Sequence, residues 1–559
     1  MQQCNMALNP LRMWKRLQVS YYGGKYSVER ALALETYTKE TSPLRVLLVC
    51  IGSPLPMIVL VMVQELIPLQ DPTDGWYVNY GFWLRSGILA FVVGHTITGQ
   101  TGVLIDGVAI STAQLVSLSA LAAVLFIVCA MALAAFIFPV PFFVLTLAPL
   151  FYALLIISVR LVVGGQVFRA MRTHSDQSIR YIIFVSAQVL VAFVYPTYES
   201  LFHLAKGTRF HLLVILLLPV IKVAVKNLML RCTTRMEDMV PEAVLFTVDF
   251  FNATYIATCM QSASSVAAIA AITVTDLVQT GVMLYGFNQR TVSARRKLLS
   301  VSTADNSLLA MAGSICRNCT AFKSQSHIGI RIRSCLPHRI SEADQTAIHS
   351  LEKIPEDKIS SDKAPTGSKL STGPVSPTKS YKRGLICWQK QSASIYPVLP
   401  EGGEAQINRR SGSAKALHLE KHSTSLCDAL EVLFTTECVV ITAYLEAVVP
   451  LFYCNYVVLM VNLPSAQYHS EMNGVSHGNI GSTVLPVFVF GLLQILSFAL
   501  IARVIRRNLG MHALYQLAFV LETQMSLIQG KLMLWMVITI CFRVVHFGMD
   551  FTYQFSWIK

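Results

Sequence analysis

Long apolar runs recur along the chain and predict a bundle of membrane-crossing helices. A helix needs about 20 mostly apolar residues to cross the hydrocarbon layer. About eleven runs have this length, namely 44–67, 82–105, 112–138, 142–163, 180–198, 209–231, 241–260, 263–286, 432–461, 483–504 and 531–550. We therefore predict an all-α polytopic transmembrane bundle of about 11 spans. Its first part is 44–286, with about eight helices, and its second part is 431–559, with about three.

Composition supports the same fold class and argues against a soluble protein. The chain has 559 residues, of which 54% are hydrophobic and 14% are charged, whereas soluble domains carry about 25% charged residues. The formal net charge is +14, and basic residues of multi-pass proteins gather in cytoplasmic segments. The positive charge therefore predicts membrane topology, with the lipid bilayer as partner, and no nucleic acid. The 13 cysteines are scattered and imply no disulfide framework.

The distribution of basic residues predicts the orientation. Residues 1–45 contain several Lys and Arg, whereas 68–81 and 462–482 contain none. Cytoplasmic loops carry the excess of basic residues, so we place the N-terminus and 287–430 in the cytosol and the C-terminus outside. The outer loop near Lys206 and Arg209 does not follow this rule cleanly. The pattern leaves plasma membrane and endomembrane equally open.

Residues 1–43 are predicted to form a cytosolic amphipathic segment. Leu11, Trp14 and Leu17 recur at helical spacing beside basic residues, which suits a helix lying on an anionic membrane surface. A second short helix is predicted in YSVERALALETYTKE, with Ser27 as its N-cap. The alternative is a solvated arm that docks on its own bundle.

Residues 287–430 are predicted to be a disordered, basic cytosolic loop. The segment is rich in Ser, Thr, Pro and Gly and poor in aromatic residues, a composition that does not support a packed core. It opens with RTVSARRKLL, and a basic cluster beside a membrane helix attracts anionic lipid headgroups; a simple stop-transfer signal is the alternative. The sequence VSPTK makes Ser376 a candidate phosphorylation site for a kinase partner.

Three consecutive apolar runs carry ionisable or amide side chains where lipid would disfavour them. Charges at mid-bilayer cost at least a few kcal/mol and usually pair inside the bundle. At 1.5 Å per residue, the lysines and acids of these runs fall at a similar depth. We predict an intramembrane polar site that binds an ion or relays protons, or else a buried ion pair that fixes helix register. Its residues are Lys222, Lys226, Asp249, Asn252, Asp276 and Gln279.

The cytosolic loop holds one spacing that resembles a metal site. Cys316 and Cys319, followed by Cys335 and His338, have the spacing of a four-ligand zinc site. Reversible acylation and unreactive thiols are the alternatives. Zinc is the one cofactor that the sequence suggests. We find no nucleotide-binding, metalloprotease or nucleophile motif, so we predict that the protein is not an enzyme.

Several phrases resemble a known group of proteins. They are YSVERALALETY (26–37), PLQDPTDGWYVNYGFWLRS (68–86), PEAVLFTVDFFNATYIATCMQS (241–262), YQLAFVLETQ (515–524) and VVHFGMDFTYQFSW (544–557). The chain is similar to uncharacterised multi-pass transmembrane proteins expanded in oomycetes. This resemblance implies a fold type, but neither an activity nor site residues.

The sequence leaves three functions open. A transporter or channel for a small solute or ion follows from the intramembrane polar site. A receptor that signals through the cytosolic loop, or a membrane scaffold that transports nothing, would carry the same apolar pattern.

Overall fold

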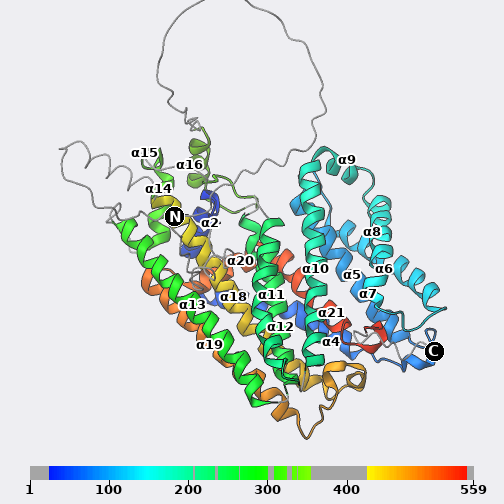
Figure 1. Cartoon of the computed structure of the whole chain (residues 1–559). Helices are drawn as coiled ribbons and strands as arrows, with labels where there is room; N and C mark the ends of the chain where they lie inside the picture. Colours follow the sequence, from blue (N-terminus) through cyan, green and yellow to red (C-terminus); the bar gives the residue numbers. More distant parts are fainter. Residues whose placement is uncertain are drawn as a thin grey trace, which may run out of the picture.

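The computed structural model describes residues 24–205, 208–232, 237–263, 265–299, 307–323, 330–336, 338–353 and 425–549. These residues form helices and connecting segments, and no strand is present among them (Figure 1). The long helices lie side by side in one bundle, and a smaller group of short helices, α14 to α16, gathers at one end.

The helices follow the apolar runs of the sequence closely. Their bounds are α3 Pro43–Gly52, α4 Leu55–Leu66, α5 Tyr80–Leu104, α6 Thr112–Ala134, α7 Phe143–Thr146, α8 Ala148–Val162, α9 Gln166–Thr173, α10 Ser175–Ala205, α11 His211–Cys232, α12 Phe246–Ser262, α13 Val266–Leu299, α18 Ser425–Met460, α19 Ile480–Leu509, α20 Ala513–Thr523 and α21 Met525–Cys541. The all-α prediction is confirmed for the described residues.

Nine helices of the described ranges are long and apolar enough to cross a membrane, or up to eleven if each of two bent pairs is one span. The pair α8 and α9 bends by 111°, and Gly164 at the bend has φ +85°, a conformation that glycine adopts without strain. The pair α20 and α21 bends by 85°. The two bent pairs therefore account for the difference between the nine helices counted here and the eleven spans predicted from the sequence. The arrangement is typical of a multi-pass membrane protein.

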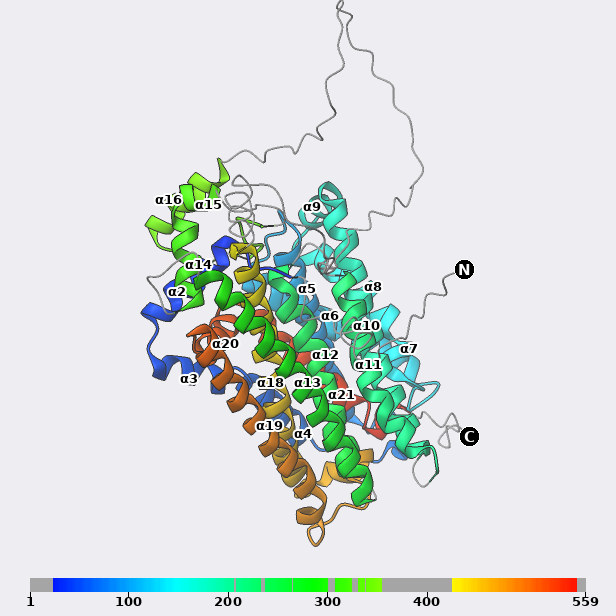
Figure 2. The same ribbon diagram turned by 60° about the vertical axis from the view of Figure 1, so that its left-hand side comes forward.

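Two helices form the centre of the bundle and have almost no outward face. The apolar stretch Ala243–Ser262 is wholly buried, and Leu426–Met460 is 94% buried, whereas Pro43–Leu66 is 33% buried. Helices α10, α11, α13, α19 and α21 pack around α12 and α18, as Figure 2 shows. Polar side chains on α12 and α18 are thereby removed from the surface.

The N-terminal arm docks on this bundle. Helix α2 (Val28–Glu40) begins after Ser27, whose side chain accepts a hydrogen bond from the Arg30 backbone, so the predicted N-cap is confirmed. Arg30 is fully buried and lies 2.9 Å from Glu437 of α18. Helix α2 therefore belongs to an arm that docks on the bundle, which was the alternative prediction for residues 1–43. The predicted amphipathic helix with Leu11, Trp14 and Leu17 lies outside the described residues.

The prediction of disorder across 287–430 was too broad. Helix α13 continues to Leu299, and α14 (Leu308–Arg317), α15 (Cys319–Lys323) and α16 (Glu342–Glu352) follow. Arg317 lies 2.8 Å from Glu35 of α2 and 2.7 Å from Asp344 of α16. The apolar run LLAMAGSIC has buried positions in α14, and averaging the composition over the whole segment concealed it. Residues 354–424, with Ser376, lie outside the described residues.

Candidate functional site

The predicted lysines and Asp249 meet at the centre of the bundle. Lys222 and Lys226 stand one turn apart on α11, and a spacing of four residues places both on one face. Lys226 Nζ lies 2.8 Å from Asp249 Oδ1 of α12, and Lys222 Nζ lies 3.7 Å from the same oxygen. All three side chains are buried. The contact expected from the sequence is therefore present.

Helix α18 completes this group with residues from a distant part of the chain. Glu446 Oε1 lies 2.6 Å from Lys222 Nζ. The Thr442 hydroxyl donates a hydrogen bond of 2.7 Å to Asp249 Oδ2. Buried charges are tolerated only when they are paired and hydrogen-bonded, and these contacts meet that need for Asp249.

Asp276 of α13 extends the group but lacks a lysine of its own. Gln494 Nε2 of α19 donates a hydrogen bond of 2.5 Å to its Oδ2, and no described cation lies within ion-pair distance. We call Lys222, Lys226, Asp249, Glu446 and Asp276 the central cluster. When all its groups are ionised, three carboxylates face two ammonium groups, so one negative charge is in excess.

A small cavity lies beside the central cluster. Asn252, Asp276 and Gln279 line it, together with Tyr198 and Pro219, and its volume is about 20 Å³. That volume is enough for one water molecule. Asn252 is buried, and its Oδ1 has no hydrogen-bond partner in the described part of the chain. The six predicted residues thus divide into two groups. Lys222, Lys226 and Asp249 form ion pairs, whereas Asn252, Asp276 and Gln279 line the cavity.

Sequence reasoning could not have assembled the whole cluster. Glu446 and Gln494 stand out as polar residues in apolar runs, which is the signal that could have found them. Their partners are 224 and 218 residues away in the chain. Helical periodicity gives the depth of a residue but not the helix that it faces.

A second buried group of charges lies near one end of the long helices. We call its residues the outer cluster, namely Glu65, Arg85, Glu199, His469, Glu471 and Arg543. Arg85 lies 2.8 Å from Glu65. His469 lies 3.1 Å from Glu65 and 3.3 Å from Glu471. Arg543, which is also buried, lies 3.7 Å from Glu199.

His469 is a titratable group of the outer cluster with a shifted pKa. Burial lowers the pKa of its imidazole, but Glu65 and Glu471 outweigh that effect and raise the pKa to about 9. The imidazole is therefore protonated at neutral pH. In that state the positive charges of Arg85, Arg543 and His469 balance the three carboxylates.

The four predicted zinc ligands have different surroundings. Cys316 is buried in α14, Cys319 Sγ lies 3.2 Å from the Ser350 hydroxyl, and the Cys335 backbone N–H contacts Asp238. The His338 ring stacks on Phe519, and burial, with Arg30, lowers its pKa to about 4. Among the described residues no three His, Cys, Asp or Glu side chains form a group that could hold a metal. The zinc site stays a prediction without geometric support.

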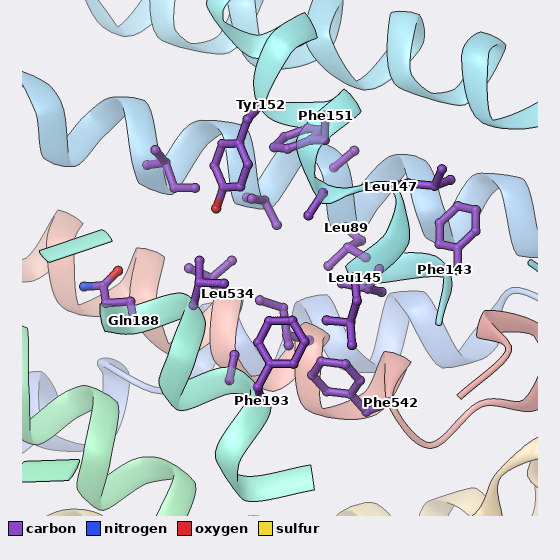
Figure 3. A pocket seen from close by; sticks show the side chains of 18 of the residues that line it. Leu89, Phe143, Leu145, Leu147, Phe151, Tyr152, Gln188, Phe193, Leu534 and Phe542 are labelled. Carbon is purple, nitrogen blue, oxygen red and sulfur yellow. The ribbon is translucent and has the colours of Figure 1, made fainter. Parts of the chain in front are cut away.

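An apolar cavity of about 110 Å³ lies between α5, α7, α8, α10 and α21 (Figure 3). Protein interiors contain few voids larger than a water molecule. The labelled wall residues of this cavity include Leu89, Tyr152, Gln188, Phe193 and Leu534.

No protein family, curated protein or solved structure matches the chain.

Proposed function

We propose that the protein is an integral membrane transporter for a small ion or solute, with the central cluster as its coupling site. The observation that carries the proposal is the excess carboxylate beside a cavity. Two lysines serve three carboxylates, and Asp276 is the one held by an amide rather than by an ammonium group.

The excess charge supplies a reason for reversible binding. An unpaired buried carboxylate is costly, and a proton or a monovalent cation removes that cost when it binds. Asp276 lies at the wall of the cavity, so a bound proton would have a water-sized space on one side. Intramembrane carboxylates of this type serve proton relays and ion pathways in pumps and transporters.

Substitution of Asp276 by Asn tests the proposal. The full chain is reconstituted into vesicles that enclose a pH-sensitive dye, and a pH gradient is imposed with and without a panel of ions, sugars and amino acids. We expect wild type to move protons or a panel solute at least about tenfold faster than Asp276→Asn, because the Asn side chain cannot take up and release the proton. Asp176→Asn, an exposed carboxylate on α10, is the matched control and should retain wild-type flux.

The proposal fails if wild-type vesicles carry neither protons nor any panel solute faster than empty vesicles. It also fails if Asp276→Asn and Asp176→Asn transport equally well. Folded yield is measured for all three proteins by size-exclusion chromatography, so that a loss of flux is separated from a loss of protein.

A signalling role is the second candidate, and the docked loop favours it. The Val28 and Glu29 backbone N–H groups donate hydrogen bonds of 2.9 and 3.0 Å to the carbonyls of Arg331 and Ile332. The Ser334 hydroxyl donates to Asp238 at 3.0 Å. The loop thereby touches the start of α2 and the segment before α12. Deletion of 354–424, which spares these contacts, should abolish partner signalling and leave the membrane bundle folded if this role is the true one.

A further inference from the structure

A groove opens at the end of the bundle where the chain turns from α19 into α20. Gly510 ends α19 in the left-handed conformation, with φ +67°, which glycine adopts without strain. Helix α20 packs on α2 and α3, and α14 packs on α2. Figure 2 shows these five helices on one side of the bundle. The groove that they line has a volume of about 820 Å³, within the usual range of about 300–1,000 Å³ for ligand sites.

One wall of the groove is apolar and open at its edge. Val46 and Met511 are buried in this wall, whereas Leu47 of α3 and Leu514 of α20 are 48% and 40% exposed. Helices α3 and α19 belong to stretches that are long and apolar enough to cross a membrane. The exposed leucines therefore lie near the end of the predicted spans, where acyl chains would contact them.

Two arginines line the same groove. Arg503 and Arg506 are exposed and line it from α19, and their spacing of three residues places both on one face of the helix. No described carboxylate lies within ion-pair distance of either guanidinium, whereas Arg45 on α3 pairs with Glu522. The described residues that line the groove include no Asp or Glu. The groove therefore combines uncompensated positive charge with an apolar wall.

We propose that this groove binds an anionic phospholipid whose headgroup has no ammonium group, such as phosphatidate or a phosphoinositide. Arginine donates paired hydrogen bonds to phosphate oxygens, and basic pockets between membrane helices bind headgroups of this type. The phosphate pairs with Arg503 and Arg506, and an acyl chain lies along Leu47 and Leu514. A choline or ethanolamine headgroup finds no carboxylate in the wall for its ammonium group. This site is separate from the central cluster and does not depend on the proposed transport.

Native mass spectrometry of the full chain in a nonionic detergent tests the proposal. Phosphatidate and phosphatidylcholine with the same acyl chains are titrated separately, and the fraction of protein that retains one lipid gives each affinity. We expect phosphatidate to bind at least about tenfold more tightly, because its headgroup carries a net negative charge. Glycerol 3-phosphate has the same phosphate without acyl chains and should not displace phosphatidate, since the apolar wall contributes to binding.

A double variant assigns the binding to the groove. Arg503→Gln combined with Arg506→Gln should lower the preference for phosphatidate to about threefold or less, because only distant basic residues then attract it. The matched control combines Arg169→Gln with Arg172→Gln. These arginines are also exposed and three residues apart, but they lie on α9, outside the groove. The control variant should retain the preference of wild type.

A second pair of variants changes the charge of the groove without removing an arginine. Leu514→Glu places a carboxylate in the wall and should abolish the preference for phosphatidate, because like charges repel. Leu514→Gln has nearly the same size without the charge and should keep the preference.

Equal affinity for the two lipids would mean that any acyl chain fills the groove, and would overturn the proposal. Displacement of phosphatidate by glycerol 3-phosphate would indicate a site for free phosphate and would overturn it as well. A lost preference in the Arg169 and Arg172 control would assign the effect to the overall charge of the protein. If the variant of Arg503 and Arg506 yields no folded protein, the Leu514 pair decides, because equal preferences in Leu514→Glu and Leu514→Gln contradict the site.

Discussion

The central and outer clusters are both buried inside the bundle, but they differ in charge balance and in space. The outer cluster balances three carboxylates with two arginines and a protonated histidine. The central cluster has three carboxylates and two lysines, and Asp276 borders a cavity. A balanced group with closed contacts holds helices together, whereas an unbalanced one with room beside it is suited to binding.

The comparison teaches that buried charge by itself is a poor sign of function. Replacing a buried ion pair by apolar residues is often neutral, but removing one partner is strongly destabilising. The informative features are the uncompensated charge and the neighbouring space. Four measurements of stability test this distinction, and they follow in order of decreasing expected change.

Arg85→Met should have the largest effect on stability. It leaves Glu65 buried and removes the hydrogen bonds from Arg85 to the Glu65 and Ile67 carbonyls. Loss of one partner of a buried pair costs about 3–5 kcal/mol. We expect a strongly reduced folded yield and melting temperature in detergent. A change of 2 °C in melting temperature corresponds to about 1 kcal/mol or less. A melting temperature within 2 °C of wild type would therefore show that the Arg85 pair does not hold the helices together.

The pH dependence of stability should report on His469. Its folded pKa of about 9 lies above the ordinary value of 6.5. Its contribution is therefore complete below about pH 6.5 and is lost as the pH rises through about 9. At about 1.4 kcal/mol per pKa unit it amounts to about 3.5 kcal/mol. Melting temperatures measured from pH 6 to 10 should fall over this window. His469→Gln should flatten the curve, and an equally steep curve in that variant would assign the effect to other groups.

Asp276→Asn should scarcely change stability. The amide keeps the shape of the carboxyl group and can still pair with Gln494, while the excess negative charge disappears. We expect a change of no more than about 1 kcal/mol, in the stabilising direction, measured by thermal unfolding at pH 7. A loss of stability as large as that of Arg85→Met would mean that the central cluster also holds the helices together, and the two clusters would then not differ in role.

Arg45→Ala should have the smallest effect and serves as the reference for exposed charges. Arg45 pairs with Glu522, but its side chain is 61% exposed. Exposed pairs contribute about 0–1 kcal/mol. We expect an unchanged melting temperature within experimental error. A larger loss would mean that the contact between α3 and α20, rather than the charge pair, had been disturbed.

The sequence supplied the apolar helices and the depth of their charges because both follow from residue type and periodicity. Lys222, Lys226 and Asp249 were predicted as partners since their helices follow one another closely. The outer cluster was not predicted, because Glu65, Arg85 and His469 come from three segments and their meeting depends on tertiary packing. The helices α14 to α16 were missed because composition, averaged over a long segment, outweighed one short apolar run.

The complete burial of α12 has a consequence for biosynthesis. Asp249 is stabilised in part by Thr442, which lies 193 residues later in the chain. Ribosomes add about 5–20 residues per second, so about 10 to 40 s pass before α18 reaches the bilayer. Before that time, Lys222 and Lys226 of the preceding helix α11 are the charged partners of Asp249 that have already been made. Because α11 precedes α12 in the chain, the lysines that pair with Asp249 are synthesised before it.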